Sequence, residues 1–268
     1  MIGSILTAVV VAYSALIGVL FLAQRSLMYQ PSQDLGTPLS VGLSEMTQLT
    51  INTSDGLQLT SWYTPAKNNG RVLIYFHGNA GHIGDRAFKV RPYIDAGYGA
   101  MLVGYRGYGG NPGAPTEDGL YLDAIATLQH LTDQDIPPAR WVLYGESLGT
   151  GVAVEMARRF AIQGTPVNAV VLEAPFTSMA DAAADHYPYV PARALVRDKF
   201  NSLAKIATIK TSLLVFHGDQ DRVVAFAQGK TLFEAARDPK SFRRLDGAHH
   251  NDLYDFGAAK VVLEFLRP

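Results

Sequence analysis

The segment 141–149 reads Trp-Val-Leu-Tyr-Gly-Glu-Ser-Leu-Gly, a short apolar run that leads into a Gly-x-Ser-x-Gly pentapeptide. A helix-like run over residues 150–160 follows directly. A serine at the tip of a sharp strand-to-helix turn has strained backbone angles, and the positions two residues away on each side crowd one another. Glycine at 145 and 149 relieves this crowding. The pentapeptide alone is a weak motif, but a strand before it and a helix after it favour a nucleophile elbow at Ser147 over an ordinary glycine-eased turn.

Apolar runs recur along the chain at residues 72–76, 100–103, 169–172 and 213–216, and helix-like segments separate them. Continuous apolar runs are typical of strands that are buried on both faces, so the pattern predicts a parallel sheet flanked by helices. Residues 47–53 and 57–64 alternate in polarity around Ser54-Asp55-Gly56, which predicts an antiparallel hairpin at the N-terminal side of this sheet. We therefore expect an α/β fold with a mostly parallel central sheet and an antiparallel N-terminal ribbon.

The composition excludes several functional classes. The chain of 268 residues has a net charge of −1 and no basic cluster, so we expect no nucleic-acid partner. It has no cysteine, which excludes a disulfide framework, a thiol nucleophile and cysteine-ligated zinc.

The N-terminal segment is apolar and uncharged over residues 2–23. As a helix it would extend about 33 Å, enough to cross a hydrocarbon core of about 30 Å. No lysine or arginine precedes it, which favours a retained membrane anchor at 1–27 over a cleaved signal peptide or a buried helix. Arg25 alone orients the anchor and favours a catalytic domain on the cytoplasmic side. We expect a linker at 28–44 and a catalytic domain at 45–268.

A serine hydroxyl needs a histidine to take its proton and a carboxylate to orient that histidine. In a sheet of this kind, both partners follow later strands, in the order serine, acid, histidine. The acid candidates are Asp221 and Asp219, which come after the apolar run 213–216. We favour Asp221, and we interpret Asp219 as a turn residue whose side chain bonds nearby backbone N–H groups.

The candidate base is one of two adjacent histidines, His249 and His250, and their sequence alone does not separate them. Neither has a further ligand at zinc-helix spacing, so we expect no metal. His77 and His217 each follow a buried strand and precede a glycine, which favours positioning roles beside the site.

The oxyanion that forms during acyl transfer needs two backbone donors. We expect them to be the N–H groups of Leu148 and Asn79, with Gly78 letting the backbone approach closely. Residues 176–209 lie between two core strands and are too long for a simple crossover, so we interpret them as a short lid. The candidate substrate contacts are His77, Gly78, Tyr187 and Tyr189.

The chain resembles the α/β-hydrolase superfamily, and within it the small membrane-anchored branch of bud-emergence-like and depalmitoylase-like hydrolases. The matching segments are Gln24-Arg-Ser-Leu-Met-Tyr29, His77-Gly-Asn-Ala-Gly81, Tyr105-Arg-Gly-Tyr-Gly109, Gly119-Leu-Tyr-Leu-Asp123, Gly145-Glu-Ser-Leu-Gly149, His217-Gly-x-x-Asp221 and His250-Asn-Asp252. In that branch, the histidine directly before Asn-Asp is the base, which implies His250. The preceding position is usually glycine, so His249 departs from the pattern and its role stays open.

The resemblance implies a serine hydrolase without a cofactor, acting on carboxylic esters or thioesters. An apolar anchor and a lid with aromatic residues favour acyl groups derived from lipids. Two alternatives remain: a peptidase or amidase on the same scaffold, and a membrane scaffold without catalytic activity. A dehalogenase or epoxide hydrolase would need an aspartate at position 147. The oligomeric state is not determined by the sequence.

Overall fold

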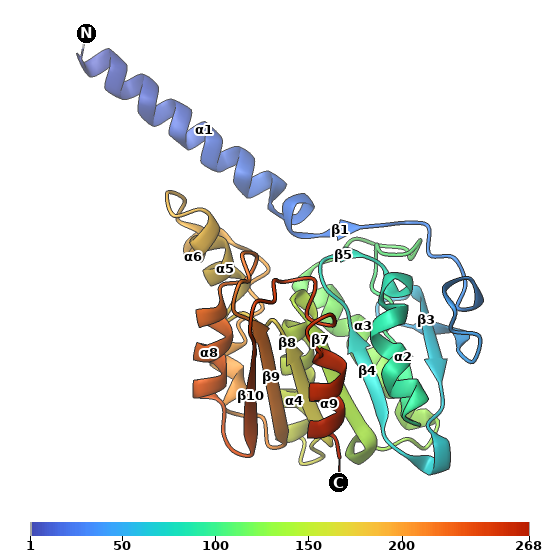
Figure 1. The fold of residues 1–268 in the computed structure, drawn as a ribbon. Helices are drawn as coiled ribbons and strands as arrows, with labels where there is room; N and C mark the ends of the chain where they lie inside the picture. Colours follow the sequence, from blue (N-terminus) through green and yellow to red (C-terminus); the bar gives the residue numbers. More distant parts are fainter. Residues whose placement is uncertain (1, 268) are drawn as a thin grey trace.

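The computed structural model describes residues 2–267, and its centre is an eight-stranded sheet (Figure 1). The spatial order is β10-β9-β8-β7-β4-β6-β3-β2. All neighbours are parallel except β2–β3 and β3–β6. The strands are β2 (Thr47–Asn52), β3 (Gln58–Thr64), β4 (Val72–Phe76), β6 (Gly99–Leu102), β7 (Trp141–Glu146), β8 (Ala169–Glu173), β9 (Ser212–Gly218) and β10 (Lys240–Leu245). The predicted mostly parallel sheet with an antiparallel N-terminal ribbon is confirmed.

Helices cover both faces of the sheet, because every central strand is apolar on both sides. In β4, Ile74 and Phe76 belong to one buried cluster, while Leu73 and Tyr75 belong to the other. This is the alternation that a strand imposes on its side chains. The first cluster includes residues of α3 (Glu117–Asp133), α4 (Leu148–Ile162) and α8 (Phe226–Ala235). The second includes residues of α2 (Ala87–Asp95) and α9 (Ala258–Phe265).

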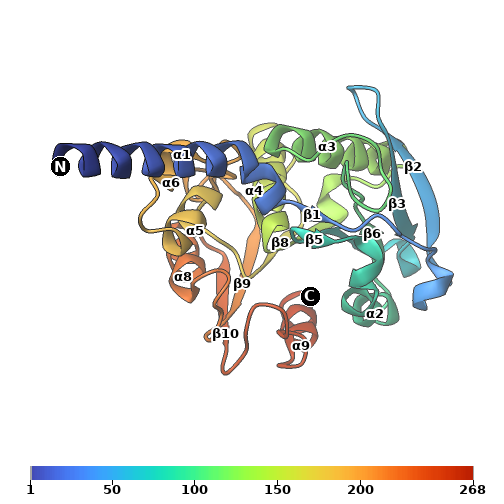
Figure 2. The ribbon, with the colours of Figure 1, turned by 90° about the horizontal axis from the view of Figure 1, so that it is seen from above.

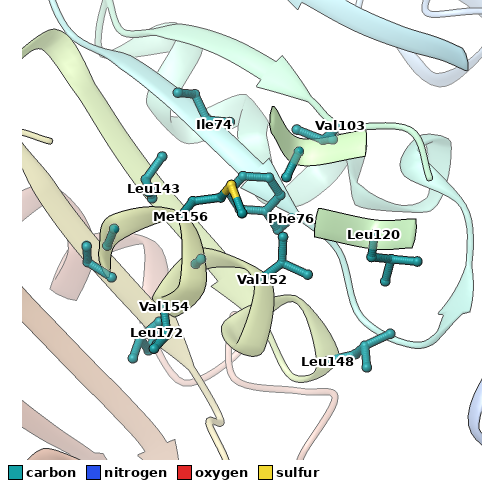
Figure 3. Packing of buried hydrophobic residues seen from close by; sticks show 14 of the residues in the cluster. Ile74, Phe76, Val103, Leu120, Leu143, Leu148, Val152, Val154, Met156 and Leu172 are labelled. Carbon is teal, nitrogen blue, oxygen red and sulfur yellow. The ribbon is translucent and has the colours of Figure 1, made fainter. Parts of the chain in front are cut away.

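Helix α4, which follows Ser147, packs tightly on the sheet. Its Val152 and Met156 point toward Phe76 of β4, with Leu143 of β7 beside them (Figure 3). All four side chains are fully buried. The N-terminus of α4 is therefore fixed against the ends of two central strands, which is where a nucleophile elbow must be rigid.

Helix α3 begins at a side-chain cap. The Thr116 hydroxyl accepts a hydrogen bond from Gly119 N at 2.9 Å and so caps the helix. The glycine-rich loop before α3 is held by Arg106, whose guanidinium binds both Asp123 of α3 and Asp55 of the β2–β3 turn. One side chain thus joins this loop to α3 and to a turn 51 residues earlier in the sequence.

The N-terminal helix α1 (Ile2–Met28) projects well beyond the body (Figures 1 and 2). Among the described residues it is the one helix long and apolar enough to cross a membrane, with a mean hydropathy of 2.6. The segment that follows lies on the body and is not a free linker. Its β1 (Gln30–Pro31) pairs in parallel with β5 (Ala80–Gly81). Tyr29 and Leu43 are buried, because the body offers apolar partners to both.

The segment predicted as a lid has two parts. Its first part contains α5 (Met179–His186) and α6 (Ala192–Leu195), which lie near α1 (Figure 2). Its second part, which contains α7 (Leu203–Ile206), returns to the body, where Phe200 is fully buried against Gly151 of α4. Short 3₁₀ turns lie at η1 (Leu39–Val41), η2 (Lys67–Asn69), η3 (Ile83–Arg86) and η4 (Pro138–Arg140).

Candidate active site

Ser147 stands at the turn between β7 and α4 in a strained conformation, with φ 48° and ψ −112°. An L-residue at such angles costs on the order of 1–3 kcal/mol and persists only where its surroundings hold it. Here the Ser147 N–H donates to Glu173 O of β8 at 2.9 Å. The Thr150 N–H and hydroxyl both donate to Ser147 O, at 2.9 and 2.6 Å. The nucleophile elbow is thus built as the sequence predicts.

The two glycines of the pentapeptide are required by different neighbours. A Cβ on Gly145 would lie 2.6 Å from Gly149 O, which is the crowding expected across the turn. A Cβ on Gly149 would lie 2.0 Å from Phe76 O, at the end of β4. Gly149 therefore lets α4 approach the backbone of the neighbouring strand, a contact that the motif alone does not predict.

The structure brings Ser147, His250 and Asp221 together. His250 Nε2 lies 3.0 Å from Ser147 Oγ, and His250 Nδ1 lies 2.6 Å from Asp221 Oδ2. Because a carboxylate only accepts hydrogen bonds, Nδ1 carries the proton and Nε2 is free to accept the Ser147 hydroxyl. The geometry that the sequence predicts for a serine, a base and an acid is present, although these residues lie in three separate loops.

The Asp221 carboxylate is enclosed, and the protein supplies all its hydrogen bonds. Its Oδ1 accepts from the N–H groups of Val223 and Val224 at 2.7 and 2.8 Å. Burial alone would raise the pKa of Asp221, but hydrogen bonds from His217 and His250, the charge of His250 and the Val224 amide outweigh it. Together they hold the pKa of this carboxyl well below its usual range. Asp221 therefore stays ionised beside His250.

His217 is the second histidine on this carboxylate. Its Nε2 lies 3.1 Å from Asp221 Oδ2 and 3.0 Å from Val224 O, so Nε2 is the protonated nitrogen and donates to both. Its ring is fully buried against Gly229 of α8, where a Cβ would meet Nδ1 at 2.3 Å. The sequence predicts a positioning role for His217 beside the site, and the structure shows that the residue it contacts there is Asp221.

His249 and Asp219, the alternative candidates for the base and the acid, lie outside the arrangement of Ser147, His250 and Asp221. His249 is exposed, and its Nδ1 contacts Gln220 O at 2.9 Å rather than Ser147 or Asp221. Asp219 accepts hydrogen bonds from Gly247 N and Arg244 at 2.7 and 2.6 Å. Asp219 therefore ties the loop after β9 to the loop after β10, a longer-range role than the local turn that we expected.

The two predicted oxyanion donors border the same space as Ser147. Asn79 and Leu148 both line a cavity that reaches Ser147. The Asn79 carbonyl is occupied by Gln30 N and Tyr108 Oη, and its side-chain amide donates to Met28 O at 3.0 Å. Within residues 2–267, no protein acceptor takes the backbone N–H of Asn79 or Leu148.

The predicted substrate contacts do not all reach this cavity. Tyr187 lines it, but Tyr189 is 86% exposed and outside it. His77 and Gly78 are buried and form no part of its wall. The His77 ring packs 4.2 Å from the Tyr105 ring, and burial, with the nearby charge of Arg86, lowers its pKa to about 3. His77 is thus a neutral packing residue behind residues 78–81, which we call the oxyanion loop because they include the predicted donor Asn79.

Beneath the elbow lies a buried group of charges that the sequence did not predict. Lys89 of α2 contacts Glu173 at 2.7 Å and Glu146 at 3.2 Å, and Arg86 contacts Glu146 at 3.0 Å. Glu146 directly precedes Ser147, and the carbonyl of Glu173 holds the Ser147 amide. Burial would raise the pKa of Glu146, but the charges of Lys89 and Arg86 hold it well below its usual range. The backbone at Ser147 is therefore held by ion pairs on both flanking strands.

The cavity in front of Ser147 has a volume of about 250 Å³ and is mainly apolar. Its walls come from parts of the chain that are distant in sequence: α1, the oxyanion loop, the elbow and the α5–α6 part of the lid. The walls also include Val223 and Val224 from the loop that carries Asp221. The arrangement can therefore place an apolar group next to a serine hydroxyl that is already hydrogen-bonded to a base.

Comparison with known families places the chain in one of them. The profile of the family described as serine aminopeptidase, S33, matches residues 67–205, which is 139 of the 268 residues. The chain belongs to this family of α/β-hydrolases. The matched region contains Asn79 and Ser147 and ends before Asp221 and His250. Those two positions therefore rest on the geometry described above.

The family contains relatives that match over most of this chain. The uncharacterized protein Rv2307c of Mycobacterium tuberculosis is 37% identical over 268 residues, covering 98% of this chain and 92% of that protein. The lysophosphatidylserine lipase ABHD12 of Danio rerio is 31% identical over 242 residues, covering 78% of this chain and 63% of the lipase.

Solved structures share the fold of this chain. The esterase Pf2001 of Pyrococcus furiosus superposes with a TM-score of 0.67 at 20% identity, covering 89% of this chain and 96% of that one. An alpha-beta hydrolase of Vibrio vulnificus superposes with a TM-score of 0.72 at 23% identity, covering 85% and 83%. At these identities the likeness concerns the fold. The resemblance to the membrane-anchored branch stays a prediction.

The strain at Ser147 predicts an unusual order of stabilities. Ser147→Gly relieves the strain at φ 48°, whereas Ser147→Ala keeps it. After the extra chain entropy of glycine, we expect Ser147→Gly to be more stable than Ser147→Ala by about 1 kcal/mol, or roughly 3 °C in Tm. Thermal unfolding of the two detergent-solubilised variants measures this difference. Equal or reversed melting temperatures would show that the elbow is not strained.

The buried carboxylate of Glu146 predicts a pH dependence of stability. Its folded pKa lies below the unfolded value of about 4.3, so its contribution is complete above that pH and is lost as the pH falls further. Glu146→Gln should lower the Tm at pH 7, and its difference from wild type should narrow between about pH 4.3 and pH 3. Glu234→Gln, at an exposed ion pair with Lys230, is the control and should change neither the Tm at pH 7 nor the pH dependence of the Tm. A difference that stays constant down to pH 3 would contradict the ion-pair interpretation.

Proposed function

We propose that the protein is a membrane-anchored serine hydrolase that cleaves carboxylic esters or thioesters of lipid-derived acyl groups. The observation that carries the proposal is the hydrogen-bonded chain from Ser147 through His250 to Asp221, which opens directly into an apolar cavity. Relatives described as lipases and a structural neighbour described as an esterase support the same reaction class.

The acylation step follows from the hydrogen bonds. Ser147 Oγ attacks the acyl carbon while His250 Nε2 takes the hydroxyl proton, and Asp221 stabilises the imidazolium that forms. The N–H groups of Leu148 and Asn79 donate to the oxygen that becomes negatively charged. When the tetrahedral intermediate collapses, His250 gives the proton to the departing alcohol or thiol. The acyl group is left as an ester on Ser147.

The deacylation step uses the same residues in reverse. A water molecule gives a proton to His250 Nε2 as its oxygen attacks the acyl carbon. The second tetrahedral intermediate expels Ser147 Oγ, which takes the proton back from His250. The products are the free carboxylic acid and the original enzyme, and no redox step or further reactant is needed.

The cavity wall favours an acyl chain over the free amino group of a peptide. Among the described residues that line the cavity there is no aspartate or glutamate. An aminopeptidase needs a partner for its substrate's ammonium group, because an unpaired charge in an apolar site is strongly disfavoured. The family description as an aminopeptidase therefore does not determine the substrate of this member. The exposed apolar helix α1 supports a location at the membrane, where acyl esters are concentrated.

Covalent labelling tests the roles of the three residues. We expect a fluorophosphonate probe to label wild type and to fail on Ser147→Ala. His250→Ala and Asp221→Asn should each lower ester turnover by at least about 10³-fold, since they remove the base or its correct tautomer. His249→Ala is the matched control and should stay within about twofold of wild type, because its exposed ring is hydrogen-bonded to Gln220 O rather than to Ser147 or Asp221. A loss in His249→Ala instead of His250→Ala would reassign the base.

Substrate series test the reaction class and the acyl preference. Each buried methylene contributes about 0.8 kcal/mol, so octanoyl esters should exceed butyryl esters in kcat/KM by at least about tenfold. An anilide with the same acyl group should react at least tenfold more slowly than the ester. Turnover of para-nitrophenyl esters, a thioester and the anilide measures both ratios. Acetyl esters cleaved tenfold better than long ones would contradict a lipid substrate, and a faster anilide would favour the amidase alternative.

A further inference from the structure

Helix α1 contributes one wall of the cavity in front of Ser147. Six residues of α1 line it, together with Ser147, Leu148 and Asn79 at its inner end: Ile17, Leu20, Phe21, Gln24, Leu27 and Met28. We propose that α1 is part of the substrate-binding site. In this arrangement, the acyl chain of an ester resident in the bilayer lies along the inner face of α1 while its carbonyl reaches Ser147. The inference rests on the function proposed above and deepens it by naming how the substrate is held.

The lining residues form one face of the helix. Positions 17, 20, 21, 24 and 28 follow the spacing that brings side chains to one side of an α-helix. These positions are partly covered, whereas Val19 and Leu22 between them are 63% and 80% exposed. One face of α1 therefore belongs to the protein and the other is free to contact lipid. A helix that served only as a tether would need no such division.

Polar contacts fix this face against the lid. The Arg25 guanidinium binds the Asp198 carboxylate through two hydrogen bonds of 2.8 and 3.0 Å, and the Asp198 side chain is only 6% exposed. The Gln24 side chain accepts from Arg197 N at 2.8 Å, and the Arg197 guanidinium lies 4.5 Å from the centre of the Phe21 ring. The wall therefore has a defined register relative to Ser147.

A second set of contacts fixes the inner end of the wall. The Asn79 side-chain amide donates to Met28 O, and Gln30 N donates to Asn79 O. The residue that we propose as an oxyanion donor is thus bonded directly to the end of α1. The segment after Met28 continues as β1, which pairs with β5 immediately beyond Asn79. The position of α1 and the oxyanion loop are coupled.

The same contacts indicate how a substrate enters. The Tyr13 hydroxyl donates to Tyr189 O at 2.7 Å, so the exposed tip of the lid lies beside α1 twelve residues before Arg25, about 18 Å along the helix. About 20 residues span the hydrocarbon core, which places Tyr13 within the depth of the bilayer if α1 crosses it. The outer end of the cavity then faces lipid, and an acyl chain enters without passing through water.

The shape of the cavity limits the class of substrate. The wall from Met28 to Ile17 covers eleven residues, about 16 Å of helix. With a volume of about 250 Å³ and mainly apolar walls, it suits one long acyl chain and excludes a charged headgroup. The substrate class is therefore an amphiphile with a long acyl ester whose polar part stays at the membrane surface.

Bulky substitutions on α1 test this inference in the full-length protein in lipid nanodiscs. Leu20→Trp places a large ring in the cavity, and Leu22→Trp places the same ring on the outer face. We expect Leu20→Trp to slow Ser147 labelling by an octadecyl fluorophosphonate at least about tenfold, while labelling by an ethyl fluorophosphonate stays within twofold. Leu22→Trp should leave both rates within twofold. Ile17→Trp, farther from the site, should slow the octadecyl probe and spare a decyl probe.

The outcomes separate this inference from the proposed function. Equal effects of Leu20→Trp and Leu22→Trp, or equal slowing of long and short probes by Leu20→Trp, would overturn a role for α1 in binding the chain. As a readout independent of substitutions, an octadecyl probe with a diazirine in its chain should crosslink to residues 17–24, and crosslinks only to α5 or α8 would also overturn it. The probes report modification of Ser147 rather than ester turnover. If wild type reacts with the probes but cleaves no ester, the proposed function is contradicted. The comparison of Leu20→Trp with Leu22→Trp would still decide whether α1 binds the chain.

Discussion

The close approach of α4 to the end of β4 is the constraint on which the site depends. Gly149 allows it, because any side chain there would collide with Phe76 O. The approach places Ser147 at a positive φ above the sheet, frees the Leu148 amide and brings Asn79 beside it. Ion pairs of Lys89 with Glu146 and Glu173 then hold the flanking strands. Breaking a buried pair typically costs about 3–5 kcal/mol, so this support is well suited to retaining a strained turn.

Helix α1 and the site form one unit in this structure. The Arg25–Asp198 pair joins α1 to the lid, and the Asn79–Met28 hydrogen bond joins it to the oxyanion loop. If α1 were attached through a flexible linker, its position would not affect the geometry of the active site. Here the residues after α1 are packed on the body through Tyr29 and the β1–β5 pairing. The position of α1 and the shape of the cavity are therefore set by the same contacts.

Local patterns predicted the central elements of the fold and the residues that meet at Ser147. Apolar runs identified β4, β6, β7, β8 and β9. The order serine, acid, histidine followed from the positions of loops after successive strands of a parallel sheet. The choice of His250 over His249 needed the family resemblance. The linker predicted at residues 28–44 was less informative. The proline, glycine and serine around residues 31–44 are typical of a loop and gave no indication that Tyr29 and Leu43 are packed on the body.

The remaining features depend on contacts that no local pattern encodes. Lys89 and Glu173 are 84 residues apart, and neither stands in a motif. The inner face of α1 could not be recognised from the sequence because residues 2–23 are uncharged and mainly apolar on every side. The lining residues other than Gln24 therefore do not differ in polarity from those on the outer face. The sequence indicated the hydrogen bond from His217 to Asp221 only weakly, by a histidine that stands at a strand end four residues before the acid.

The most direct test of the central claim is detection of the acyl-enzyme. Turnover of a long-chain para-nitrophenyl ester would be quenched in acid within seconds, and the peptide containing Ser147 would be weighed by mass spectrometry. The mechanism predicts that this peptide gains the mass of one acyl group, that the gain follows the chain length of the ester, and that it is absent from Ser147→Ala. Turnover that persists in Ser147→Ala, or an acyl group found on another residue, would contradict it.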